Sequence, residues 1–289
     1  LTRGAAGARR VRIAPGVALH TLEWHGSPVA LPFLLVHGLA SNARTWERVG
    51  ALLAGEGHRV AAVDLRGHGR SDDPGRGYDF PTLCDDLLAV LDALGYERAV
   101  VVGQSTGGNV AVELARRAGP RLAGVAGVDG GALELQRLWP RWEDCADAMA
   151  PPVLEGRTSD EVEGWLRAGH PSWDDAGLEA SMANYEVAAD GTVRPRLRRE
   201  HHMRILRALW EHRPSSFFAE LTTPVLLLLA DTGDDWTEAK RAEAAGAREL
   251  LRRSRVRWFS PADHDLHVER PGQVAAELRR AAEDGFFER

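Results

Sequence analysis

The sequence has few cysteines, and this limits the kinds of site that it could build. Its 289 residues include only Cys84 and Cys145. Two cysteines this far apart form neither a disulfide framework nor the ligand spacing of a metal site. A reducing compartment is the simplest interpretation, although two cysteines are enough for one disulfide.

Long hydrophobic runs are also absent. The longest apolar run, residues 224–230, is much shorter than the roughly 20 residues of a membrane-spanning helix and is typical of a buried strand. We therefore expect no membrane insertion. No signal peptide is visible, which favours a cytoplasmic protein, and the start at Leu1 instead of Met leaves open the removal of an N-terminal segment.

The sequence has no excess of positive charge. Its 36 basic and 42 acidic side chains give a net charge of −6 and a pI near 6.0. This balance argues against a surface for nucleic acid or for an anionic membrane. We therefore expect a small-molecule partner, and the sequence leaves the choice between a monomer and a homodimer open.

The most informative stretch lies at residues 98–111. A β-branched run ends at Gly103, and an Ala-rich helical pattern begins shortly after it. The motif Gly-x-Ser-x-Gly between them puts Ser105 at a sharp strand-to-helix turn, where the small Gly103 and Gly107 let the two arms pass. This context predicts a nucleophile elbow. The alternative is a turn whose serine only caps the helix.

Short apolar runs alternate with helical patterns through the first part of the chain. Strands are expected at residues 11–13, 17–24, 31–36, 58–63, 98–103 and 122–128, the first two forming an antiparallel hairpin. Helical patterns follow the third, fourth and fifth of these runs. Strands that alternate with helices predict a parallel sheet with helices on both faces.

This alternation stops after residues 129–131. From about residue 132 to 218 the sequence has amphipathic helical segments and many tryptophans, but no run typical of a strand. Strands are expected again at 224–230 and 256–259, and helices at 239–253 and 272–287. We predict one α/β core formed by residues 1–131 and 219–289, interrupted by a helical cap of residues 132–218.

Four motifs in this order resemble those of the α/β-hydrolase fold superfamily. They lie at residues 37–38, 64–71, 103–108 and 262–271, each at the end of an expected strand. The resemblance covers almost the whole chain. It implies an α/β-hydrolase fold with a mostly parallel eight-stranded sheet and a lid, residues 132–218, over the active site. In the second motif we expect Asp64 to brace a loop at the sheet edge.

A serine hydroxyl is a weak nucleophile near neutral pH and needs a base within hydrogen-bond reach. The resemblance implies that this base is His264, the first histidine of the loop after the last strand. His267 is the competing candidate. The backbone N–H groups of Leu39 and Thr106 would form the oxyanion hole, since preoriented dipoles stabilise a developing negative charge.

The acid that orients the base has three candidates. Most members of the superfamily carry it after the seventh strand, but the corresponding position here is Gly233. A second position used in the superfamily, after the sixth strand, is Asp129. We take Asp129 as the acid and keep Asp231 and Asp234 in reserve, because an aspartate at position 129 could also do no more than cap the strand end.

Two tryptophans of the expected cap, Trp139 and Trp142, are candidates for binding a bulky, mostly apolar substrate, although aromatic residues at helical spacing more often pack in a core. His170, His201 and His202 lack the spacing of metal ligands, so we expect no metal. No lysine follows the glycine-rich turns as a phosphate-binding loop requires, and we expect no cofactor.

These residues favour a serine hydrolase that cleaves a carboxylic ester or lactone through an acyl-enzyme. Ser105 argues against the haloalkane dehalogenases and epoxide hydrolases of the superfamily, which have a carboxylate at the elbow. Several alternatives stay open. They are a non-catalytic small-molecule receptor on the same fold, a biosynthetic cyclase or acyl transferase, a carbon–carbon hydrolase or cofactor-free dioxygenase, and a hydrolase of thioesters or amides. Fold alone does not decide among them.

Overall fold

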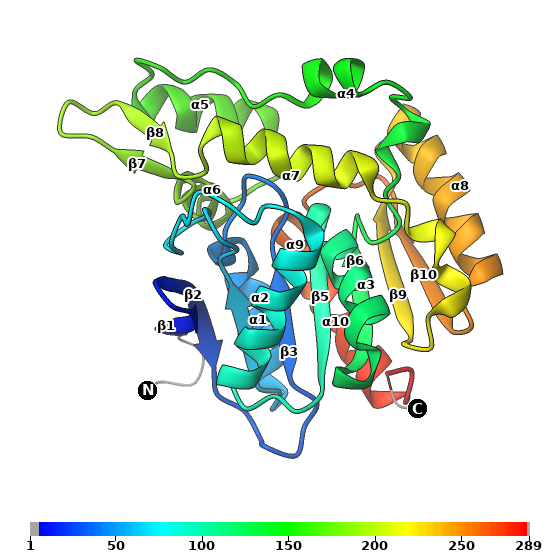
Figure 1. Cartoon of the computed structure of the whole chain (residues 1–289). Coiled ribbons are helices and arrows are strands. Elements are labelled where there is room, and N and C mark those ends of the chain that lie inside the picture. Colours follow the sequence, from blue (N-terminus) through cyan, green and yellow to red (C-terminus); the bar gives the residue numbers. More distant parts are fainter. Residues whose placement is uncertain (1–5, 288–289) are drawn as a thin grey trace.

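The computed structural model describes residues 6–287, which form one eight-stranded sheet with helices around it (Figure 1). The strand order is β1-β2-β4-β3-β5-β6-β9-β10. The strands are β1 (Gly7–Ala14), β2 (Val17–Trp24), β3 (Phe33–Val36), β4 (Val60–Val63), β5 (Ala99–Gln104), β6 (Leu122–Val128), β9 (Val225–Ala230) and β10 (Ser254–Phe259). β1 and β2 are antiparallel to their neighbours and the other strands are parallel, which confirms the predicted fold class.

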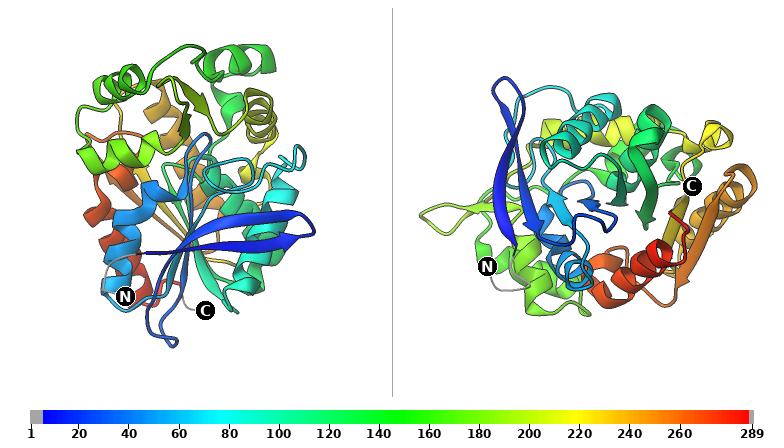
Figure 2. Two further views of the ribbon diagram at one scale, coloured as in Figure 1. Left: turned by 90° about the vertical axis from the view of Figure 1, so that its left-hand side faces the viewer. Right: turned by 90° about the horizontal axis from the view of Figure 1, so that it is seen from below.

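The central strands are apolar along their whole length because both faces of the sheet are covered. Every residue of β3, β4, β5, β6 and β9 is buried. One face packs against α2 (Phe80–Ala93), α3 (Thr106–Ala118) and α8 (Asp235–Leu250), and the other against α1 (Glu47–Gly55) and α10 (Pro271–Glu283), as the view from below shows (Figure 2). None of the helices within residues 6–287 has the length and apolar character to cross a bilayer.

The segment between β6 and β9 lies over one end of the sheet, beyond the carboxyl ends of the parallel strands (Figure 1). We call residues 132–218 the insert; these bounds stay a prediction. Its main helices are α4 (Trp142–Met149), α5 (Ser159–Gly169), α6 (Asp175–Met182) and α7 (Arg199–Glu211). Both core segments on either side of the insert contribute strands to the same sheet. Residues 1–5 and 288–289 of the predicted core lie outside the described part.

The prediction that the insert has no strand was wrong. Its β7 (Tyr185–Val187) and β8 (Val193–Pro195) form a two-stranded antiparallel sheet, with Val187 opposite Val193. Three residues are too few to show a period-two pattern, and the turn between them is closed by Gly191, whose φ is +82°. The pairing of β7 with β8 therefore could not be predicted from either segment alone.

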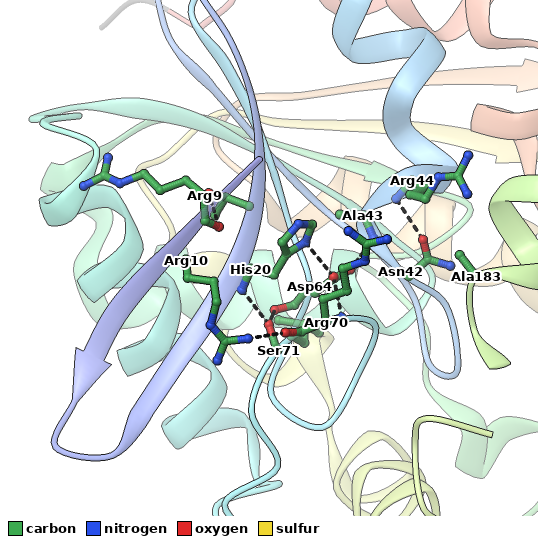
Figure 3. Close-up of polar contacts among 12 residues, drawn as sticks. Arg9, Arg10, His20, Asn42, Ala43, Arg44, Asp64, Arg70, Ser71 and Ala183 are labelled. Atoms are coloured by element: carbon green, nitrogen blue, oxygen red, sulfur yellow. Dashed lines mark hydrogen bonds and ion pairs between the residues drawn. The ribbon is translucent and has the colours of Figure 1, made fainter. Parts of the chain in front are cut away.

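Asp64, at the end of β4, ties three segments together (Figure 3). Its carboxylate accepts hydrogen bonds from the backbone N–H groups of Ala43 (2.6 Å) and Arg70 (2.9 Å) and lies 2.9 Å from Nδ1 of His20. Ser71 Oγ donates to the carbonyl of Asp64 and accepts from the N–H of His20. These contacts agree with the expected bracing of the loop after β4.

The two cysteines are not bonded to each other. Cys84 lies on α2 and Cys145 on α4, and both thiols are free and buried. Burial raises the pKa of Cys84 well above its ordinary value and that of Cys145 to about 11, so neither is a ready thiolate.

The close crossing of β5 and α3 gives a test of the turn between them. A Cβ at Gly103 would overlap the backbone carbonyl of Gly107. We expect Gly103→Ala to lower the free energy of unfolding by about 3 kcal/mol, because neither backbone can move away. Urea denaturation measures this change.

Gly246 provides the matched control, because it lies within α8 and no atom stands within 4 Å of the place that a methyl group would take there. Gly246→Ala should raise the free energy of unfolding by about 1 kcal/mol through helix propensity. Equal effects of the two substitutions would contradict the tight crossing.

Candidate active site

Ser105 occupies the turn between β5 and α3 in a strained backbone conformation. Its φ is +51° and its ψ is −121°, a region that non-glycine residues adopt at a cost of about 1–3 kcal/mol. The neighbouring backbone holds it there: Ser105 N–H donates to the carbonyl of Val128 (3.0 Å), and Gly108 N–H donates to the carbonyl of Ser105 (2.9 Å). A Cβ at Gly130 would overlap the Ser105 backbone, so only glycine fits there.

A cavity of about 410 Å³ lies between the core and the insert, and Ser105 is part of its wall. The remaining lining residues are Leu39, Thr106, Asp129, Leu133, Leu135, Met149, His202, Leu209, Thr232, Asp234, Trp236, Lys240, Asp263 and His264. The insert supplies apolar side chains to this wall, together with His202. The core supplies most of the polar groups.

His264 and Asp129, which are far apart in the sequence, meet at this cavity. Nδ1 of His264 lies 2.7 Å from Oδ2 of Asp129. Asp129 follows β6 and its side chain is only 2% exposed, whereas that of His264 is 46% exposed. The second oxygen of Asp129 accepts a hydrogen bond from the N–H of Ala230 at the end of β9 (2.8 Å).

The surroundings of His264 favour its charged form. Packing around the ring disfavours the imidazolium, but the hydrogen bond and charge of Asp129, with the charge of Asp265, outweigh this effect and raise the pKa of His264. The competing His267 is fully buried against Trp46, with ring centroids 4.3 Å apart. Burial lowers the pKa of His267 to about 3, so it stays neutral.

The two reserve acids have other partners. Asp231 lies 3.2 Å from Ser260 Oγ and accepts the N–H of Gly233. Asp234 caps α8 by accepting the N–H of Thr237, which is why this helix begins before the expected residue 239. Within residues 6–287, neither carboxylate is hydrogen-bonded to His264.

The backbone N–H groups of Leu39 and Thr106 are unpaired within residues 6–287, and both residues line the cavity. The loop of Leu39 is held by His37, whose Nδ1 lies 2.7 Å from the carbonyl of Gly38 and whose Nε2 accepts the N–H of Leu65 (3.0 Å). Burial lowers the pKa of His37, which keeps the neutral ring that this pairing needs.

The aromatic wall of the cavity differs from the one expected. Trp139 and Trp142 do not line it, whereas Trp236 does. Trp139 packs edge-on against Trp236 with ring centroids 5.3 Å apart, and Trp142 packs against Trp210 at 5.9 Å. Trp139 therefore packs against a residue of the cavity wall without lining the cavity itself. The sequence could not predict this, because it does not show which side chain packs against Trp139 or Trp142.

Sequence reasoning also missed Lys240, a buried residue of α8 beside Asp129. Its Nζ lies 3.1 Å from each carboxylate oxygen of Asp129 and 2.5 Å from the carbonyl oxygen of Ala230. One signal was available: Lys240 is the only lysine among the 36 basic residues of the sequence.

No group of three or more His, Cys, Asp or Glu side chains within residues 6–287 is arranged to hold a metal ion. The histidines of the insert have separate partners. His170 lies 2.8 Å from Asp263, His201 stacks on Tyr78 at 4.2 Å, and His202 lies 3.4 Å from the carbonyl of Met149.

Comparison with known families agrees with this architecture. The family model described as alpha/beta hydrolase fold matches residues 32–271. The chain belongs to this family. A non-heme chloroperoxidase of Streptomyces lividans is 36% identical over 110 residues, which are 38% of this chain and 40% of that protein. The Bacillus subtilis AB hydrolase superfamily protein YisY is 40% identical over 93 residues, 32% of this chain and 33% of that protein.

The chain thus matches two fifths or less of the length of these curated relatives. Solved structures match over more of the chain. E-2-(acetamidomethylene)succinate hydrolase has a TM-score of 0.77 at 24% identity, over 95% of this chain and 98% of that one. A protein described as an N-acyl homoserine lactone degrading enzyme has a TM-score of 0.70 at 22% identity, over 94% and 99%. At these identities the likeness shows the shared fold.

The contact between His264 and Asp129 predicts how the histidines of the α/β hydrolase titrate. We expect His264 to titrate above the ordinary value of about 6.5, because Asp129 stabilises its charged form. Asp129→Asn should lower the pKa of His264 by about one unit or more, since the charge is lost. NMR titration of the histidine rings measures both.

The variant His264→Gln identifies the resonance of His264 among the 11 histidines. His267 serves as the internal control. The titration covers about pH 5 to 9, around the ordinary histidine pKa of about 6.5, and His267 should not titrate in this range. A His264 signal unmoved by Asp129→Asn would contradict the coupling.

Proposed function

We propose that this protein is a serine hydrolase with the triad Ser105, His264 and Asp129. One observation carries the proposal: Ser105 and His264 line the same cavity, and His264 is hydrogen-bonded to the buried Asp129. Nucleophile, orienting acid and base follow one another in the chain in the order Ser, Asp, His, which is the order of this fold.

In the proposed mechanism, Nε2 of His264 takes the proton of Ser105 as the hydroxyl oxygen attacks the carbonyl carbon of the substrate. The N–H groups of Leu39 and Thr106 receive the oxyanion of the tetrahedral intermediate. Imidazolium then protonates the leaving alcohol and an acyl-enzyme forms. A water molecule, deprotonated by His264, releases the acid and restores Ser105.

Asp129 has an orienting role in this mechanism. Its contact with Nδ1 keeps the proton of the neutral ring on that nitrogen, so that Nε2 is free to accept the proton of Ser105. Its negative charge stabilises the imidazolium without taking the proton. The pair 2.7 Å apart at the cavity wall supports this assignment over Asp231 and Asp234.

The lining of the cavity favours a bulky, mostly apolar ester or lactone. Leu133, Leu135, Met149 and Leu209 come from the insert and Trp236 from α8. Transfer of apolar substrate surface onto these side chains favours binding. We propose that the insert acts as the cap over a small-molecule site in a cytoplasmic enzyme. The structurally similar proteins include one that degrades N-acyl homoserine lactones, which is a lactone chemistry of this kind.

The first functional test removes the nucleophile and the base. With p-nitrophenyl acetate and butyrate, Ser105→Ala and His264→Ala should each lower kcat by about a million-fold. The double variant should lower kcat little further, because the residues of a triad act as a unit. Ser27→Ala, at an exposed serine, is the matched control and should keep full activity.

A fluorophosphonate probe separates two explanations for a lack of turnover. Either the protein is a serine hydrolase that does not accept the test esters, or it is not a hydrolase. The probe should label the wild-type protein and Ser27→Ala but not Ser105→Ala. If the wild-type protein shows no turnover and is not labelled, the proposal is overturned and a small-molecule receptor is favoured.

The choice of the acid is tested separately. Asp129→Asn should lower kcat by about ten-thousand-fold, because the neutral amide no longer holds the productive tautomer of His264. Asp231→Asn and Asp234→Asn each remove one negative charge from the segment after β9. Their kcat should stay within about ten-fold of the wild-type value. A damaging Asp231→Asn or Asp234→Asn beside a mild Asp129→Asn would make the assignment wrong.

A further inference from the structure

The ammonium group of Lys240 is fully paired next to the carboxylate of Asp129. The side chain is 3% exposed, and Nζ reaches both oxygens of Asp129 and the carbonyl of Ala230. An ammonium group has three N–H donors, and three acceptors surround it. Lys240 and His264 therefore share the carboxylate of Asp129, and both contact its Oδ2.

The choice of lysine at this position is unusual for this chain. Every other basic residue, including all those on the exposed faces of helices, is arginine. Arginine offers a planar fork that binds both oxygens of a carboxylate, whereas lysine is a compact point charge. Lys240 contacts both oxygens of Asp129, and Oδ2 still keeps its 2.7 Å contact with Nδ1 of His264.

Lys240 is the cation that balances Asp129. Glu243, one turn further along α8, is also buried, but its carboxylate accepts the N–H of Glu134 (2.7 Å). Burial raises the pKa of Glu243 to about 8, so this carboxyl is mostly protonated at neutral pH and adds little negative charge. The buried pair is therefore Lys240 with Asp129.

We propose that Lys240 is a positioning residue of the triad, whose ammonium group fixes the Asp129 carboxylate and limits how strongly that carboxylate stabilises the protonated form of His264. This inference rests on the proposed function. An unbalanced buried carboxylate would stabilise the imidazolium so strongly that His264 would be occupied by a proton over much of the neutral range. The ammonium charge opposes this effect.

Several other titratable groups lie near His264 or line the same cavity. Asp263 and Asp265 lie on its own loop, His170 of the insert pairs with Asp263, and His202 and Asp234 line the same cavity. These groups stay in place when Lys240 alone is changed. A shift in the titration of His264 caused by that change therefore reports on Lys240.

The main experiment compares Lys240→Met with the wild-type protein. Loss of the ammonium charge should raise the pKa of His264, so the acidic limb of the kcat/KM profile should move up by about one pH unit. NMR titration of His264 should move by the same amount, with no need for activity. Arg248→Met, which removes an exposed charge from the same helix, is the control and should move neither.

Lys240→Arg retains the charge with a different shape. Its acidic limb should stay where it is in the wild-type protein, while kcat/KM falls by roughly ten-fold or more because the fork turns the carboxylate away from His264. An unshifted limb and an unshifted His264 titration in Lys240→Met would overturn the inference. An inactive wild-type protein that no fluorophosphonate labels would instead overturn the proposed function.

A measurement on the unchanged protein covers the case in which the variants do not fold. Because the sequence has one lysine, labelling with ¹³C,¹⁵N-lysine gives the side-chain signal of Lys240 alone. Its Cε shift should show an inflection at the pH where His264 titrates, since both groups contact Asp129. A Cε shift without this inflection would contradict the coupling.

Discussion

The buried carboxylate of Asp129 joins four parts of this molecule that are separate in the sequence. It lies at the end of β6 and contacts the N–H of Ala230 on β9, Nζ of Lys240 on α8 and Nδ1 of His264 on the loop after β10. A carboxylate removed from water is costly unless it is paired and hydrogen-bonded. The two core segments that flank the insert must therefore come together around it, which also brings the loop of His264 to the cavity.

The turn at Ser105 is the second constraint on this region. The strained φ of Ser105 persists because the backbone around it is closely packed on every side, at Gly103, Gly107 and Gly130. The same packing leaves the N–H of Thr106 facing no protein acceptor within residues 6–287. The strained backbone of Ser105 and the unpaired N–H of Thr106 both cost free energy, which the packing of the surrounding sheet offsets.

The insert and the core contribute different properties to the cavity. The core carries Ser105, Asp129 and His264 on or beside strand ends, which the sheet holds rigidly. The insert adds apolar side chains. It is joined to the core by polar contacts such as the pair of His170 with Asp263 and the two hydrogen bonds between Asn109 and the backbone of Leu133. The polar groups of the cavity wall and most of its apolar lining thus come from separate parts of the chain.

Local patterns in the sequence were enough to predict the sheet, its parallel strands and the turn at Ser105, because each depends on residues that are neighbours in the chain. The resemblance to a known superfamily pointed to His264, Asp129 and the two N–H donors, but it left three aspartates as candidates for one role. Only the tertiary structure distinguished their partners, since Asp129 and His264 are separated by 135 residues.

The paired β7 and β8, the lining by Trp236 in place of Trp139 and Trp142, and the contact of Lys240 with Asp129 were likewise decided by tertiary structure. Each depends on which surfaces of distant segments meet. A periodic pattern carries information on which face of an element is buried, but not on the partner that buries it.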